Sequence, residues 1–125
     1  MSRVFASAIA CFILTGIASA EPFQRLSAEQ IRADFFGVEL IGETARSGLP
    51  WRECITPQGK SLSQFEGETL SGQLVVTEDN RACFVYEAGP RCFDVFFSGE
   101  TYLLSGSADF KVTKRIEGVE ACSAG

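Results

Sequence analysis

Turn signals that recur about every ten residues are the feature of this sequence that most limits its fold. After residue 37 they occur at Gly48, Pro57-Gln58-Gly59, Gly67, Asp79-Asn80, Gly89-Pro90, Gly99 and Gly106. Glycine reaches backbone conformations that other residues avoid, and asparagine and proline also favour chain reversals. Because the reversals are regular and closely spaced, only short strands fit between them. The spacing therefore predicts an antiparallel β-meander.

The segments between the turns alternate as strands with one buried face do. Ala82, Phe84 and Tyr86, for example, take every second position of one segment. Strands are expected at 38–45, 51–56, 61–65, 70–77, 81–86, 92–97, 102–105 and 110–113. They predict a mainly β, single-domain fold, a small closed or nearly closed barrel, with a two-layer β-sandwich as the alternative.

One short helix is expected before the strands. Ser27 can cap it, Gln30 can complete a capping box, and Leu26 with Ile31 can form a hydrophobic staple. These residues predict a helix over 28–35 that covers one opening or edge of the barrel.

The first twenty residues have the pattern of an export signal. Arg3 precedes an apolar run at 4–17, and Ala18-Ser19-Ala20 matches a small-residue cleavage site. We expect a signal peptide at 1–20 that is cut after Ala20, with an uncleaved anchor as the alternative. A lipid attached at Cys11 is disfavoured, because the residues before it lack the usual leucine. No later segment is long and apolar enough to cross a bilayer as a helix.

The mature chain would consist of a lead-in at 21–26 and one β-rich domain at 27–122. The leader contains a single charged residue, Arg3, so its removal moves the net charge from −5 to −6. This acidity argues against nucleic acid and against anionic membrane surfaces as partners. An exported product is expected in the periplasm or outside the cell.

Four cysteines follow the leader: Cys54, Cys83, Cys92 and Cys122. An even number in a small exported domain predicts disulfides, and four cysteines allow three pairings. Cys83 and Cys92 flank a turn, so a hairpin would place them within bridging distance. We favour Cys83–Cys92 together with Cys54–Cys122, which would hold the chain end. Their spacing fits no zinc pattern.

The chain contains no histidine, which excludes Ser-His-Asp and Cys-His catalysis and histidine-bound metals. No cofactor or metal site is predicted. Carboxylates could still catalyse hydrolysis, and Glu53, Glu66 and Glu68 are the residues to test. Glu66 and Glu68 flank Gly67, a pattern more typical of the rim of a turn.

Two groups of residues are candidates for a partner surface. Trp51 and Arg52 belong to residue types enriched at binding hot spots. Lys111, Lys114 and Arg115 form the basic cluster of the chain, which could meet an acidic partner. Each group also has a purely structural interpretation, as a half-buried tryptophan and a solvated strand end.

One stretch resembles a known pattern. It begins at Gly72, passes through Cys83-Phe84-Val85-Tyr86 and Cys92-Phe93-Asp94-Val95, and ends at Gly99-Glu100-Thr101-Tyr102. It is similar to a pattern in small exported Gram-negative proteins of unknown function, in which a cysteine-containing strand leads to a second cysteine and a turn with a tyrosine. The resemblance implies export, a Cys83–Cys92 hairpin and a β-rich fold, and it brings no catalytic residues.

Three functions from different classes follow. The first is a periplasmic binding or interaction module that contacts an envelope protein. The second is a carrier of a small apolar ligand, because the many aromatic residues could line a cavity in the barrel. The third is a carboxylate-dependent hydrolase. The absence of a catalytic motif favours the first and predicts no enzyme. A filled or hollow interior would separate the first two.

Overall fold

A computed structural model describes residues 22–123 of the chain. The predicted signal peptide at 1–20, its cleavage after Ala20 and Cys11 lie outside the described residues. No helix in the part that is described is long and apolar enough to span a membrane.

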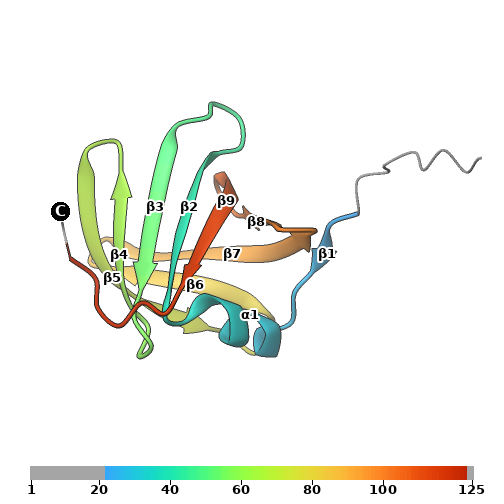
Figure 1. Cartoon of the computed structure of the whole chain (residues 1–125), viewed down its shortest axis with the longest axis horizontal. Helices are drawn as coiled ribbons and strands as arrows, with labels where there is room; N and C mark the ends of the chain where they lie inside the picture. Colours follow the sequence, from blue (N-terminus) through green and yellow to red (C-terminus); the bar gives the residue numbers. More distant parts are fainter. Residues whose placement is uncertain (1–21, 124–125) are drawn as a thin grey trace, which may run out of the picture.

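The described chain is mainly β, with one short helix and nine strands (Figure 1). In chain order the elements are β1 (Gln24–Arg25), α1 (Ala28–Phe35), β2 (Val38–Thr44), β3 (Pro50–Ile55), β4 (Lys60–Phe65), β5 (Glu68–Val76), β6 (Arg81–Tyr86), β7 (Gly89–Ser98), β8 (Thr101–Ser105) and β9 (Asp109–Glu117).

Strands β2 to β9 form a closed antiparallel barrel in which each strand pairs with its neighbours in sequence. The circle closes where β9 pairs with β2, from Val38 opposite Glu117 to Thr44 opposite Phe110. Because the barrel is closed, each of its strands has a hydrogen-bonded neighbour on both sides. The predicted barrel is confirmed, and the sandwich alternative is not the fold.

Helix α1 covers one end of the barrel. The Ser27 hydroxyl accepts a hydrogen bond from the backbone N–H of Gln30, whose side chain accepts one from the Ser27 backbone, so the expected capping box is present. Ile31 and Phe35 are both 0% exposed and join the barrel core, where the Phe35 ring lies 5.3 Å from that of Tyr102. The predicted helix and its covering role are confirmed.

Part of the expected lead-in is a strand. Gln24 and Arg25 pair with Phe97 and Phe96 of β7, and the Leu26 side chain is buried in the core. Strand β7 is longer than β6, so its last residues offer backbone groups that β1 satisfies. The alternation pattern could not show this, because two residues are too few to alternate.

The opposite end of the barrel, which we call the mouth, is formed by the connections at 45–49, 66–67, 87–88 and 106–108. In Figure 1 the β2–β3 and β4–β5 connections lie at the far end of their strands from α1. The β4–β5 connection is a two-residue turn in which Glu66 and Gly67 have φ of 50° and 78°. Positive φ at both positions matches the twist of a tight hairpin.

Two disulfides hold the barrel. Cys83 and Cys92 stand directly opposite each other on β6 and β7, with Cα atoms 4.0 Å apart. Cys54 on β3 is bonded to Cys122 beyond β9, with Cα atoms 5.8 Å apart. Both pairings are the ones favoured from the sequence. They indicate that the chain matures in an oxidising environment outside the cytosol.

Candidate functional site

The barrel interior is filled by side chains. A cavity of about 30 Å³ lies near the mouth. It is lined by Trp51, Ser63, Phe65, Phe84, Tyr86, Arg91, Phe93 and Phe110. A space of this size holds about one water molecule, whereas pockets for organic ligands measure about 300–1,000 Å³.

Aromatic rings close most of the mouth. The ring of Phe110 lies 5.1 Å from Trp51, 5.8 Å from Phe65 and 5.8 Å from Phe93, measured between centroids. The tilted and edge-to-face arrangements are those that aromatic pairs prefer. These four aromatic side chains therefore form a packed core at this end.

Glu53 is a carboxylate inside this core, and its side chain is 0% exposed. On β3 it lies on the same face as Trp51 and Ile55, whose side chains also point into the barrel, so the strand geometry turns it inward. The Tyr86 hydroxyl donates a hydrogen bond of 2.8 Å to Glu53 Oε1. Ser63 lies directly opposite Glu53 on the neighbouring strand β4.

Gly72 makes room for this contact. It lies between Ser61 on β4 and Tyr86 on β6. A Cβ atom at Gly72 would lie 2.7 Å from the Tyr86 ring and 3.0 Å from Ser61 Oγ. The missing side chain lets the Tyr86 ring lean across β5 so that its hydroxyl reaches Glu53.

The polar cluster is incompletely satisfied. Glu53 Oε2 and Ser61 Oγ are buried and have no hydrogen-bond partner among the described residues. Burial raises the pKa of the Glu53 carboxyl from 4.5 to about 7, although nearby Tyr86, Ser63, Ser61 and Trp51 stabilise its anion. Glu53 is therefore largely protonated in the folded protein in mildly acidic solution.

Tyr86 connects Glu53 with the surface. Burial raises the pKa of the Tyr86 hydroxyl, and the Glu53 carboxylate raises it further, so this group keeps its proton. The guanidinium carbon of Arg91 lies 5.9 Å from the centre of the Tyr86 ring, within the range of a cation–π contact. The side chain of Arg91 is exposed and also lines the small cavity.

Two open grooves lie at the mouth, on either side of the β4–β5 turn. The first, of about 610 Å³, combines apolar Leu49, Pro50, Trp51 and Phe65 with a rim that includes the acidic residues of that turn. The second has a similar volume, about 610 Å³. Its lining residues are Thr69, Leu70, Ser71, Tyr86, Glu87, Ala88, Gly89, Pro90 and Arg91.

Of the two candidate groups for a partner surface, the register places Arg52 and Lys114 on one outer face, because both stand opposite Ile41 of β2, and it places Trp51 on the inner face. Trp51 is 6% exposed and lies inside the mouth, while Arg52 points outward and is paired with Glu39. Lys111 and Lys114 are exposed on β9. Arg115 donates to the backbone carbonyl of Asp34 at 2.8 Å, beside the end of α1. Trp51 and Arg52 both line the first groove. The basic cluster is split, because Lys111 and Lys114 are exposed on β9 whereas Arg115 is bonded to the end of α1.

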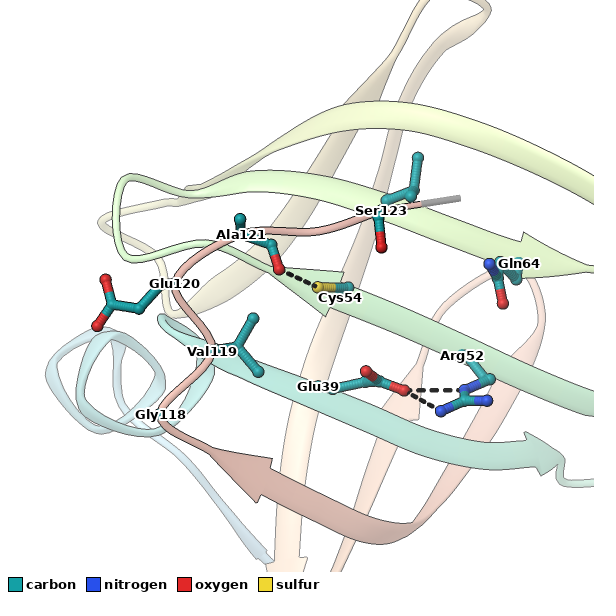
Figure 2. A pocket seen from close by; sticks show the side chains of 10 residues that line it. Glu39, Arg52, Cys54, Gln64, Gly118, Val119, Glu120, Ala121 and Ser123 are labelled. Carbon is teal, nitrogen blue, oxygen red and sulfur yellow. Dashed lines mark hydrogen bonds and ion pairs between the residues drawn. The ribbon is translucent and has the colours of Figure 1, made fainter. Parts of the chain in front are cut away.

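A further recess of about 380 Å³ lies under the C-terminal segment. Figure 2 shows this segment, from Gly118 to Ser123, running over the outer face of β2, β3 and β4, with the Glu39–Arg52 ion pair in the recess. The Cys54–Cys122 bond ties the segment to β3. The recess therefore depends on the disulfide for its outer wall.

The acidic residues named as hydrolase candidates are not brought together. Glu66 and Glu68 are exposed at the β4–β5 turn, whereas Glu53 is inside the barrel. Within residues 22–123, no group of three or more histidine, cysteine, aspartate or glutamate residues could hold a metal ion. The site that the structure does assemble, Glu53 with Tyr86, Ser61 and Ser63, was not predicted as a cluster.

Comparison of the chain with models of protein families, with curated proteins and with solved structures found no match. The resemblance to small exported Gram-negative proteins stays a prediction.

Proposed function

We propose that the chain is an exported, disulfide-stabilised interaction module of the Gram-negative periplasm that binds a protein partner at the mouth of its barrel. The observation that carries the proposal is the filled interior, because a cavity of about 30 Å³ leaves recognition to the outer surface. Export rests on the predicted signal peptide at 1–20, and the two disulfides support it.

The first groove is the best candidate for the contact. Leu49 is 39% exposed beside Pro50 and Phe65, so a partner's apolar side chain would find apolar surface there. Buried aromatic and apolar anchors supply most of the energy of protein interfaces. The groove volume, about 610 Å³, is ample for one large side chain.

The charges of the groove favour a basic partner. Glu66 and Glu68 are exposed on its rim, and the cation that lines it, Arg52, is already neutralised by Glu39. The mature chain as a whole would be acidic. A partner segment with an apolar anchor beside Lys or Arg would complement both features.

Crosslinking at single positions tests this function. A photoreactive side chain at Leu49 should capture a specific envelope protein, and competition by a synthetic peptide from the captured segment should abolish the product. Val75 is a matched control, because it is also an exposed apolar residue, at 45%, but lies on the outer face of β5. Equal labelling from Leu49 and Val75, or no product at either, would contradict the proposal.

Native mass spectrometry tests the carrier alternative in the same preparation. The filled barrel predicts a single mass for the oxidised protein, without a bound apolar molecule. A retained ligand that survives desalting would favour the carrier and overturn the choice of the mouth surface as the binding site.

A further inference from the structure

We propose that Glu53 is a proton-operated switch for the mouth of the barrel. With its proton, it maintains the closed arrangement described above. Without the proton, its charge draws water into the small cavity and rearranges Trp51 and Tyr86 at the mouth. The switch is a property of the isolated chain and does not depend on the proposed partner.

The burial of Glu53 suits a protonated carboxyl better than a carboxylate and outweighs the nearby hydroxyls that stabilise the anion. Oε1 accepts from Tyr86 at 2.8 Å, while Oε2 is buried without a donor. The neighbouring Ser61 Oγ, also buried, lacks a partner. A proton on Glu53 gives this region a donor and leaves no charge to solvate, whereas an unsolvated carboxylate at a 0% exposed position is strongly unfavourable.

No fixed positive charge compensates the anion from the strands that pack around it. Leu40 of β2 and Ser63 of β4 face Glu53 directly in the strand register, and neither titrates. Strand β6 contributes Tyr86, which keeps its proton. Strand β7 contributes Arg91, an exposed cation that lies over the Tyr86 ring rather than beside the carboxylate. Ionisation of Glu53 would therefore pull water or Arg91 inward.

Two side chains near Glu53 also shape the surface of the mouth. Trp51 lies two residues before Glu53 on the same inward face of β3 and lines the first groove. Tyr86 donates to Glu53 and lines the second groove. A change at Glu53 thus reaches the second groove through the Tyr86 hydrogen bond and the first groove through its neighbour Trp51 on β3. Packed interiors respond to such a change by adopting a second arrangement, because they are not continuously deformable.

Trp51 is a built-in reporter, because it is the single tryptophan of the chain. Its fluorescence should be followed from pH 5 to pH 9 in the oxidised protein, with far-UV circular dichroism to show that the barrel stays folded. We expect a reversible transition centred near neutral pH, with increased quenching by acrylamide above it. The chain has no histidine, and its four described cysteines are in disulfides, so few other groups titrate in this range.

Two variants assign the transition. Glu53→Gln should remove it, and Glu39→Gln, a carboxylate on the outer face of β2, should leave it unchanged. Tyr86→Phe removes a donor to the anion and should move the midpoint to higher pH. This third variant, with the unmodified protein, decides the question if Glu53→Gln fails to fold. A flat profile in the unmodified protein, or a transition that persists in Glu53→Gln, would overturn the proposal.

Discussion

The two ends of the barrel differ in the polarity of their buried side chains. At the capped end, Ile31, Phe35, Val38 and Ile55 are at most 1% exposed and purely apolar. Towards the mouth, the core contains the buried Glu53 carboxyl group, whose Oε2 is unpaired, and a small cavity, while the unpaired Ser61 Oγ lies nearer the capped end, opposite Ile55. An apolar core would stabilise the mouth more, since each unsatisfied buried polar group costs about 1–3 kcal/mol. The capped end therefore stabilises the fold, and the mouth retains polar groups at the expense of stability.

Truncation of one phenylalanine at each end gives the largest expected effect. Phe35→Ala should lower the free energy of unfolding by about 3–5 kcal/mol, because it leaves a dry cavity under α1. Phe110→Ala should cost about 1–2 kcal/mol less, because water entering the mouth can bind the polar groups of Ser63 and Tyr86, which line the small cavity together with Phe110. Urea unfolding of the oxidised proteins measures both.

Phe23→Ala is the matched control, since this phenylalanine is 48% exposed, and it should change stability by less than about 0.5 kcal/mol. Equal losses for Phe35→Ala and Phe110→Ala would mean that the two ends do not differ in the way described.

The pH dependence of stability gives the next effect. The Glu53 pKa is raised from 4.5 to about 7 on folding, so between these values the folded state keeps a proton that the unfolded state has lost. Stability from this group is therefore fully present below about pH 4.5 and is lost as the pH rises towards 7. At about 1.4 kcal/mol per pKa unit, the loss amounts to roughly 3 kcal/mol.

Unfolding of the unmodified protein and of Glu53→Gln at several pH values isolates this contribution. The variant should gain relative stability as the pH rises, and the gain should level off above pH 7. A stability difference that is independent of pH between 4 and 8 would contradict a proton held on Glu53.

A smaller effect is expected from Gly72→Ala. The added methyl group would meet the Tyr86 ring and push its hydroxyl away from Glu53. Overpacking of this kind costs about 1–3 kcal/mol. Ser71→Ala is the control, because Ser71 is the exposed neighbour on the same strand. If both variants unfold at the same urea concentration, Gly72 has no role in placing Tyr86.

Most of the fold could be predicted from the sequence because its signals are local. The capping residues of α1, the alternation of the strands and the spacing of the turns depend on neighbours only a few residues apart. The cysteine pairing was also predictable, since a hairpin places Cys83 opposite Cys92. Strand β1 was missed because its formation depends on the extra length of β7, which lies far along the chain.

The cluster of Glu53, Tyr86, Ser61 and Ser63 was not predicted, although the sequence does indicate the inward position of Glu53. The alternation Trp51-x-Glu53-x-Ile55 places the carboxylate on the buried face, and a strict reading of the strand period would have turned it inward. The contact with Tyr86, however, requires strands β3 and β6 to face each other across the barrel and Gly72 to lie between them. That arrangement depends on how strongly the sheet curls between β3 and β6, which the local pattern does not specify.

We expect Glu53 to stay protonated inside the folded barrel up to about neutral pH. A carbon-detected NMR titration of the oxidised protein, with the side-chain carboxyl signal of Glu53 assigned by its loss in Glu53→Gln, measures this directly. This signal should have its midpoint at about pH 7. A midpoint near 4.5, the value for an ordinary glutamate, would contradict it.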